Sequence, residues 1–264
     1  MTAASIDNHW PSEDCAKAFW DQHHALPYKQ LLRDTTAQID PQPGERWLDL
    51  GCGAGHLAGA IWTKSAGRVA EVIASDCAGI NAVKIEELRQ KLSPVPSPQK
   101  LHFVQVNFSD GLPQFATGSL DGVVAGLTLS YAESFDEACG KFTDAGYDHV
   151  LSEIQRILKP NGRLIFSVNV PNPSWGWVFI KSLGGGFRLS RPGKVLLNAF
   201  KMMKYGNWLK REAKRGRFHY LPLPAVQAKL RQAGFATSSG SLSYAGQAYV
   251  IRASKQSAAA QKAA

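Results

Sequence analysis

Short apolar runs and stretches of helical spacing alternate along the middle of the chain. The apolar runs are typical of buried strands, and they cover 69–76, 101–108 and 119–129. Helical spacing is found at about 80–92 and at 223–235, and Gly234 is expected to stop the second of these helices. Because strands that alternate with helices form parallel sheets covered on both faces, the pattern predicts a single α/β domain over residues 1–264.

The stretch WLDLGCGAGHLA (47–58) places an apolar strand, an acid and three glycines directly before a helix. Gly51, Gly53 and Gly55 carry no Cβ, so the backbone can turn tightly there and approach a ligand closely. The amides at the start of the following helix would face that ligand with a partial positive charge. A dinucleotide fingerprint, GxGxxG, needs glycine where this chain has His56. The stretch therefore predicts a nucleotide-cofactor loop and weakens an NAD interpretation.

The next apolar run, VAEVIASD (69–76), ends on the acid Asp76. A carboxylate at the end of this strand can accept both ribose hydroxyls of a bound nucleoside. Asp76 could instead be the N-cap of the helix at 80–92, and the two roles can coexist.

Asp49, Gly51, Gly53 and Gly55 match DxGxGxG, the first motif of class I S-adenosylmethionine-dependent methyltransferases. The chain resembles this family from about Arg46 to Ala253, apart from one long insertion. RILKPNGRLIFSV (156–168) resembles the family's helix, turn and fifth strand, with a left-handed Asn161 in place of the usual glycine. The resemblance implies a Rossmann-like fold, with a mostly parallel seven-stranded sheet, helices on both faces and a helical cap before the last helix.

The cofactor that the resemblance implies is S-adenosylmethionine. Carried over onto this chain, the family's cofactor site comprises Asp49, Gly51, Cys52, Gly53, Gly55, Asp76, Cys77, Asn107, Phe108 and Gly126. At Asn107 the family often has an acid that accepts the adenine amino group, and the amide oxygen of Asn107 can still accept that bond. Phe108 could cover an adenine face or belong to the ordinary core.

The implied reaction is an in-line displacement at a sulfonium methyl group, in which the protein mainly aligns the acceptor with the methyl group. A general base is needed only for an acceptor that is a poor nucleophile when protonated, so the catalytic residues stay unassigned. The candidates are Tyr131, after the fourth strand, and His219, which lies next to Tyr220 just before the last helix. The segment 19–32 could also supply His23, His24 or Tyr28 from an N-terminal helical cover expected at 12–40.

Most of the positive charge lies in the expected cap, 171–221. Between Lys181 and Arg217 there are eleven Lys and Arg residues and one acid, Glu212, a net charge of +10 in a chain of net charge +9. Three interpretations stay open: an anionic membrane face, a nucleic-acid surface, or a solvated helical cap. Leu196, Phe200 and Met203 recur at near-helical spacing with lysines between them, which favours lipid over nucleic acid.

Two further features affect the expectations for this cap. The chain has GLTLSY (126–131) where methyltransferases of exocyclic base amines commonly have an NPPY-like motif, which also disfavours nucleic acid. Three consecutive glycines in SLGGGF (182–187) cannot form a stable helix interior, so they predict a turn or hinge. This segment could be a lid over the reactants or a surface loop between two helices.

The remaining composition points to a cytoplasmic protein with peripheral membrane contact at most. The four cysteines have neither CxxC nor metal-ligand spacing, so no zinc site and no disulfide framework are expected. No apolar run reaches the length of a membrane span, and no segment resembles a signal peptide. The tail 254–264 lacks an apolar periodicity and is expected to be disordered.

The sequence thus predicts methyl transfer to a hydrophobic or amphipathic small molecule, such as a quinone precursor, a lipid or a secondary metabolite. The acceptor atom, oxygen, carbon or nitrogen, is left open. Two alternatives are an NAD(P)-dependent oxidoreductase, which shares the strand, glycine loop and ribose acid, and a non-catalytic membrane-surface protein built on a methyltransferase fold.

Overall fold

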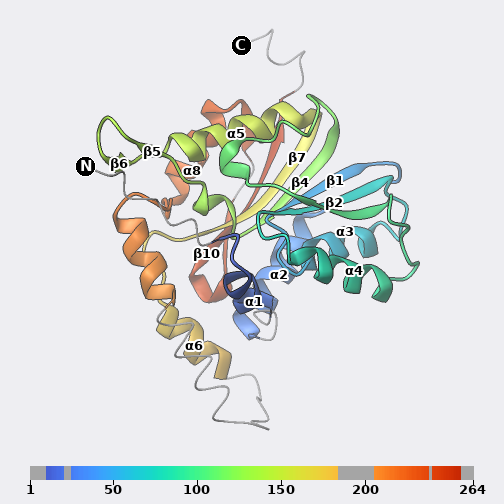
Figure 1. Ribbon diagram of the computed structural model, residues 1–264, viewed down its shortest axis with the longest axis horizontal. Coiled ribbons are helices and arrows are strands. Elements are labelled where there is room, and N and C mark those ends of the chain that lie inside the picture. Colours follow the sequence, from blue (N-terminus) through green and yellow to red (C-terminus); the bar gives the residue numbers. More distant parts are fainter. Residues whose placement is uncertain (1–9, 21–24, 184–204, 238–239, 257–264) are drawn as a thin grey trace.

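The computed structural model describes residues 10–20, 25–183, 205–237 and 240–256. Within these ranges the core is an eight-stranded sheet of order β3-β2-β1-β4-β7-β10-β8, with β9 paired to β10 (Figure 1). Its strands are β1 (Arg46–Leu50), β2 (Glu71–Asp76), β3 (Leu101–Gln105), β4 (Leu120–Gly126), β7 (Leu158–Asn169), β8 (Phe235–Thr237), β9 (Ser241–Ser243) and β10 (Ala248–Lys255).

The first five strands in this order pair in parallel, and β10 runs antiparallel to β7, β8 and β9. The predicted Rossmann-like α/β fold is confirmed, and β9 adds an eighth strand to the seven expected. This strand is only three residues long and leaves Leu242 61% exposed. So short a strand has no apolar alternation by which it could be recognised in the sequence.

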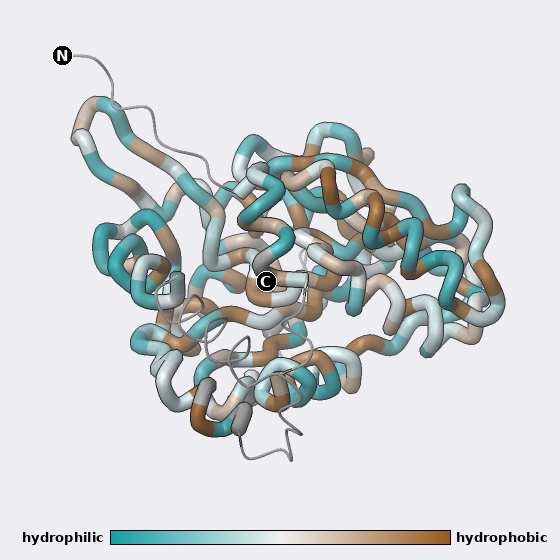
Figure 2. Tube along the Cα trace, turned by 60° about the horizontal axis from the view of Figure 1, so that its bottom comes forward, coloured by the Kyte–Doolittle hydropathy of each residue, from teal (hydrophilic) through white to brown (hydrophobic). Residues whose placement is uncertain are grey.

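Helices cover both faces of the sheet (Figure 1). The helices that flank the strands are α2 (Leu26–Gln38), α3 (His56–Lys64), α4 (Asn81–Lys91), α5 (Ala145–Ile157) and α8 (Leu223–Gln232). Successive residues of β1 belong to different apolar clusters: Trp47 packs with Leu57 of α3, and Leu48 packs in the cluster that contains Val150 of α5. Hydrophobic and hydrophilic positions alternate along the helices in Figure 2, as expected for helices with one face on a sheet.

Two predicted turns have the expected backbone conformation. Asn161 lies inside β7 at a φ of +63°, the left-handed conformation expected of it. Gly234 follows the end of α8 at a φ of +86°, where it stops the helix as predicted.

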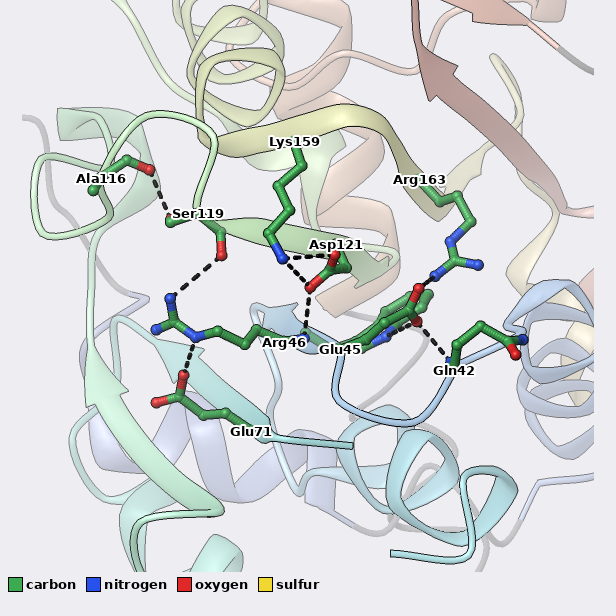
Figure 3. A network of polar contacts seen from close by, with 10 residues as sticks. Gln42, Glu45, Arg46, Glu71, Ala116, Ser119, Asp121, Lys159 and Arg163 are labelled. Atoms are coloured by element: carbon green, nitrogen blue, oxygen red, sulfur yellow. Dashed lines mark hydrogen bonds and ion pairs between the residues drawn. The ribbon is translucent and has the colours of Figure 1, made fainter. Parts of the chain in front are cut away.

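Ion pairs join the strands at the amino end of the sheet (Figure 3). Asp121 of β4 accepts the backbone amide of Arg46 at 2.9 Å and the ammonium of Lys159 at 2.7 Å. The guanidinium of Arg46 donates to Glu71 of β2 at 2.6 Å. Arg163 of β7 pairs with Glu45, just before β1. One polar network therefore links β1, β2, β4 and β7 at this end.

The carboxyl end of the sheet is covered by segments outside the alternating pattern. They are α1 (Glu13–Trp20), α6 (Trp175–Leu183), the helical residues 205–214, the hairpin β5 (Phe135–Asp136) and β6 (Lys141–Phe142), and the short 3-10 turns η2 (Phe108–Asp110), η3 (Leu129–Tyr131) and η4 (Tyr244–Gly246). Arg217 anchors the cap by donating to Glu133 at 2.8 Å. Within the ranges given above, no helix has the length and apolarity needed to cross a membrane.

Several predictions concern residues outside the described ranges. The glycines after Leu183, the amphipathic pattern of Leu196, Phe200 and Met203, and the side chains of His23 and His24 all belong to this group. The expected tail 254–264 is described only as far as residue 256, and its first two residues complete β10. The range 12–40 holds helices α1 and α2, and 171–221 holds α6 and the helical residues 205–214.

Candidate active site

The loop between β1 and α3 has left-handed backbone at all three predicted glycines. The φ angles of Gly51, Gly53 and Gly55 are +71°, +51° and +80°. A Cβ on Gly51 would lie 2.2 Å from Cγ2 of Thr128, because the loop after β4 packs directly against this glycine. A Cβ on Gly53 would meet no atom within 4 Å, so the loop is open on that side. This glycine loop can therefore accommodate a ligand at Gly53.

Asp49 is buried beneath the glycine loop, with 1% of its surface exposed. Its Oδ2 accepts the backbone amide of Ala58 at 2.9 Å, in the first turn of α3, while its Oδ1 is buried and has no hydrogen-bond partner. Burial raises the pKa of Asp49 to about 7, and the negative charge of Asp76 contributes to this rise. A cationic ligand group would relieve this cost of burying the carboxylate.

Asp76 ends β2 and holds the glycine loop. Its Oδ2 accepts the amide of Gly53 at 2.9 Å, and its Oδ1 accepts the amide of Ala78 at 3.0 Å. Oδ2 keeps a lone pair that could receive a ribose hydroxyl, and at Oδ1 a second hydroxyl would replace the weak hydrogen bond from the Cys77 thiol at 3.7 Å. The alternative role as N-cap of the following helix is wrong: α4 begins at Asn81 after Ile80, and Asp76 stabilises the turn at 76–78 instead.

The candidate adenine residues lie at the end of β3. Asn107 caps η2: its Oδ1 accepts the amide of Ser109 at 3.3 Å, and its Nδ2 donates to Asp110 at 2.9 Å. The oxygen retains a second lone pair, as the predicted contact to an adenine amino group requires. Phe108 is half-buried and packs against the central apolar cluster. The roles of Asn107 and Phe108 toward a base stay predictions.

The other cofactor candidates, Cys52, Cys77 and Gly126, lie at or just after the ends of β1, β2 and β4. The amide of Cys52 donates to the carbonyl of Ser75 at 2.8 Å, and Gln105 fixes the carbonyl of Cys77 at 2.9 Å. Burial raises the pKa of both thiols, so neither has the character of a reactive thiolate. Gly126 ends β4, and its carbonyl accepts the hydroxyl of Thr128 at 3.0 Å.

Helix α1 contacts both α4 and the cap. The indole of Trp20 donates to Asn81 of α4 at 2.7 Å, and the Sγ of Cys15 lies 3.4 Å from the hydroxyl of Tyr205. Burial raises the pKa of Cys15, and the negative charge of Asp76 adds to this rise. The helix thus links α4 to the cap.

A hydrogen-bonded cluster of two tyrosines and an asparagine lies beside these loops. Tyr131 of η3 and Tyr220 have their hydroxyl oxygens 3.1 Å apart, and the Nδ2 of Asn169 donates to the Tyr131 hydroxyl at 3.2 Å. Asn169 is fully buried at the carboxyl end of β7, and its Oδ1 has no partner. Burial raises the pKa of Tyr131 to about 12 and that of Tyr220 further, so both phenols are neutral.

Aromatic side chains from other parts of the chain surround this cluster. The ring of Trp10 lies 4.7 Å from that of Tyr131, and Phe218 meets the same ring edge-on at 5.1 Å. In a separate apolar cluster, the ring centroids of Tyr244 of η4 and Tyr28 of α2 lie 6.2 Å apart. Tyr131 is therefore packed among aromatic side chains of the cap and the N-terminal segment.

Two loops at this edge hold non-glycine residues in left-handed conformations. Leu127, directly after β4, has a φ of +55°, and its amide donates to the hydroxyl of Ser167 at 3.0 Å. Tyr244 and Ala245 have φ angles of +55° and +53°. Such conformations persist only where the surrounding contacts impose them, and they concentrate at functional sites.

His219 is buried, whereas a general base must be accessible to the substrate. Only 6% of its surface is exposed, its Nε2 lies 2.9 Å from the carbonyl of Ala132, and its amide donates to Ser130 at 2.7 Å. Burial lowers its pKa. These contacts fix the loop that carries Tyr131, so the geometry favours a positioning role, and a role as base stays untested.

Sequence reasoning singled out Tyr131 and mentioned Tyr28 and Tyr220, but it overlooked three other residues. Thr128 lies in a stretch quoted for another reason, and Asn169 directly follows one, so their places after the fourth strand and at the end of the fifth could have identified them. Tyr244 follows a strand too short to be recognised, so no local pattern marks it.

Comparisons with known proteins agree with this geometry. A family model described as a methyltransferase domain matches residues 48–166, which include the glycine loop, Asp76 and Tyr131. Methyltransferase phqN of Penicillium fellutanum is 28% identical over 153 residues, which are 58% of this chain and 38% of that protein. Nocamycin O-methyltransferase of Saccharothrix syringae is 26% identical over 148 residues, 56% of this chain and 46% of that protein.

Solved structures show the same fold. A SAM-dependent methyltransferase from Aquifex aeolicus superposes with a TM-score of 0.55 at 14% identity, covering 91% of this chain and 97% of that one. The two curated relatives are longer proteins, and the chain spans less than half of their length.

Proposed function

Because the chain belongs to the class I S-adenosylmethionine-dependent methyltransferase family, we propose that it transfers a methyl group to a hydrophobic or amphipathic small molecule. The family and the fold imply S-adenosylmethionine as the cofactor. The observation that carries the proposal is the conjunction, around one open glycine loop, of Asp76 and the unsatisfied carboxylate oxygen of Asp49.

The residues present fit this cofactor in charge and in hydrogen bonding. Asp76 can accept one ribose hydroxyl at the free lone pair of Oδ2 and the other at Oδ1 in place of the weak Cys77 thiol contact, and Asn107 has a lone pair for the adenine amino group. The buried Oδ1 of Asp49 lacks a donor, and the cofactor carries an ammonium group that could supply one. The open side of Gly53 leaves space for the cofactor to approach the loop closely.

When bound, S-adenosylmethionine supplies an activated methyl group on a positively charged sulfur. The protein's contribution is then to exclude water and to hold the acceptor in line, which can supply roughly 7 to 11 kcal/mol of the barrier. Helix α1 and the cap residue Tyr205 would close the site through their contact at Cys15. The phenol of Tyr131, with its raised pKa, is suited to donate a hydrogen bond and poorly suited to remove a proton.

Two observations support the proposed acceptor class. Aromatic rings of Trp10, Tyr131, Phe218 and Tyr244 favour a planar apolar acceptor. The relative from Saccharothrix syringae acts, by its name, on nocamycin, which supports a secondary metabolite among the predicted classes of quinone precursor, lipid and secondary metabolite.

We also propose peripheral contact between the cap segment 181–217 and an anionic membrane. Its net charge of +10 supports such contact, and nucleic acid is the less favoured partner. On α6, which leads into this segment, Trp177 is 44% and Ile180 56% exposed, and the Lys181 ammonium lies 4.9 Å from the Trp177 ring. Exposed apolar groups beside a cation are the combination that binds at a lipid interface.

Calorimetric titration with S-adenosylmethionine, S-adenosylhomocysteine and NADPH tests the proposed cofactor. Micromolar binding of the first two, lost in Asp76→Ala, supports the proposal and justifies an acceptor screen. Preferential binding of NADPH would favour an oxidoreductase. Absence of binding to all three, with binding to anionic vesicles retained, would favour a non-catalytic membrane-surface protein.

A further inference from the structure

The cluster of Tyr131, Tyr220 and Asn169 has hydrogen-bonding capacity that its own contacts do not use. Asn169 donates to the Tyr131 oxygen, and the two phenol oxygens share one further bond at 3.1 Å. That bond uses only one of the two hydroxyl protons, whichever residue donates it. Within the described part of the chain, neither hydroxyl has another hydrogen-bond partner. One phenol O–H therefore remains as an unused donor.

The same cluster also contains an unused acceptor. The Oδ1 of Asn169 is buried and has no partner, although the Nδ2 of the same amide lies 3.2 Å from the Tyr131 oxygen. A buried polar atom without a partner is costly, and in native proteins it is commonly satisfied by a ligand or an ordered water. The unused donor is either the Tyr131 hydroxyl, which contacts Asn169 directly, or the Tyr220 hydroxyl, which lies one hydrogen bond further along the cluster. The cluster therefore offers both a donor and an acceptor to one small polar group.

We infer that this cluster binds a neutral hydroxyl group carried by a planar, largely apolar molecule. A hydroxyl both donates and accepts, so it can give its proton to Asn169 and receive the proton of the tyrosine pair. This inference rests on the proposed function, because it identifies the acceptor class of the same site.

The surroundings favour an uncharged phenol or enol over an anion. Both tyrosines are neutral, so they bring no charge to the cluster. Arg217, whose guanidinium lies 5.5 Å from the Phe218 ring, is already paired with Glu133 at 2.8 Å and lies 3.8 Å from Glu212. Its charge is thus compensated within the cap. The rings of Trp10 and Phe218 pack on Tyr131, so the surroundings of its hydroxyl are aromatic, which favours a flat apolar molecule.

Binding of 1-naphthol and 1-methoxynaphthalene tests this inference, because the two differ in the hydroxyl proton. Dissociation constants are measured for both compounds by ligand-observed NMR in the presence of saturating S-adenosylhomocysteine. The proteins are the unmodified chain, Tyr131→Phe, Tyr220→Phe and a matched control, Tyr249→Phe, which changes a half-buried tyrosine of β10 outside the cluster. Melting temperature and S-adenosylhomocysteine affinity establish that each variant is folded and retains the cofactor site.

The expected result is that 1-naphthol binds the unmodified chain at least about fivefold more tightly than 1-methoxynaphthalene. Whichever of Tyr131→Phe and Tyr220→Phe deletes the unused hydroxyl proton should remove most of this preference, whereas Tyr249→Phe should retain it. Equal affinity for the two compounds in the unmodified chain, or an unchanged preference in both cluster variants, would overturn the inference. If the unmodified chain does not bind S-adenosylhomocysteine, the proposed function fails, and this outcome is distinct from a failure of the hydroxyl-binding inference.

Discussion

The Oδ2 atom of Asp76 accepts the backbone amide of Gly53 over 2.9 Å, so the end of the second strand fixes the loop that follows the first. The same carboxylate is the candidate partner of the ribose hydroxyls. One side chain would thus both hold the loop in place and bind the cofactor, and substitutions of Asp76 can separate these two roles.

Asp76→Asn keeps one acceptor oxygen and removes the charge. We expect S-adenosylhomocysteine affinity to fall roughly 10- to 100-fold, because hydrogen bonds to a charged group contribute about 1.5 to 3 kcal/mol. Asp76→Ala should bind more weakly still, since it also frees the Gly53 amide. Isothermal titration calorimetry measures both variants. Equal affinity of Asp76→Asn and the unmodified chain would rule out Asp76 as the ribose acid.

Gly51→Ala tests the packing of the glycine loop on the loop after β4. The new Cβ would combine left-handed strain with a 2.2 Å approach to Thr128, so we expect a loss of about 2 to 5 kcal/mol in the free energy of unfolding. Gly118→Ala is the matched control, because its φ of +62° is similar and its Cβ would meet nothing within 4 Å. The control should lose only about 1 to 2 kcal/mol in urea titrations. Similar losses in both would show that the contact with Thr128 is unimportant.

The raised pKa of Asp49 predicts how cofactor affinity depends on pH. A cationic ligand favours the ionised carboxylate, so affinity should rise by up to about tenfold per pH unit below pH 7 and level off above it. Asp49→Asn should flatten this dependence, as measured by calorimetry between pH 5.5 and 8.5. A dependence that persists unchanged in Asp49→Asn would assign it to another group.

The stability of the cofactor-free chain should fall as the pH rises, whereas the cofactor affinity rises. Because the folded pKa of Asp49 is raised from 3.8 to about 7, the folded chain binds this proton more tightly than the unfolded chain. The contribution of Asp49 to stability is therefore complete below about pH 4 and is lost as the pH rises through 7. Comparison of urea midpoints for the unmodified chain and Asp49→Asn across this range isolates the effect. A difference that does not vary with pH would contradict it.

His219→Ala should act mainly through the position of Tyr131. Loss of the contact with the Ala132 carbonyl leaves a buried acceptor unsatisfied, so we expect a destabilisation of about 1 to 3 kcal/mol. If His219 is only a positioning residue, His219→Gln, which can still donate, should recover part of the stability and of the turnover. A folded His219→Gln protein without turnover would instead support His219 as the base.

Membrane contact through the cap predicts cosedimentation with anionic vesicles and weaker binding at high salt. Trp177→Ser with Ile180→Ser should reduce this binding severalfold without changing S-adenosylhomocysteine affinity. Val83→Ser is the control, because Val83 is 52% exposed on α4, outside the cap. Binding that is insensitive to salt and to the α6 variants would contradict the proposed surface.

The parts of the site that could be predicted from sequence are those that depend on neighbouring residues. The glycine loop, Asp49 and the acid ending β2 lie within thirty residues of one another, and their spacing carries the signal. The left-handed Asn161 was likewise predictable, because a local turn imposes it. Asn169 became recognisable only in the fold, since its role depends on a contact with Tyr131, 38 residues earlier.

The environments of Tyr244 and His219 could not be predicted from the sequence. The left-handed conformation of Tyr244 arises from packing between α2 and η4, which no local pattern encodes. His219 has the residue type of a general base, but burial against the Ala132 carbonyl depends on how the cap folds back onto η3. Residue type alone therefore did not predict its environment.

The ion network at the amino end of the sheet bears on how this protein could change its substrate. Asp121, Arg46 and Glu71 join neighbouring strands at the end opposite to Tyr131 and Asn169. Contacts that hold the strands in register are thus separate from the contacts proposed to select the acceptor. Mutations among the tyrosines can then accumulate without disturbing strand pairing, which leaves the scaffold free to acquire new acceptors during evolution or in directed selection.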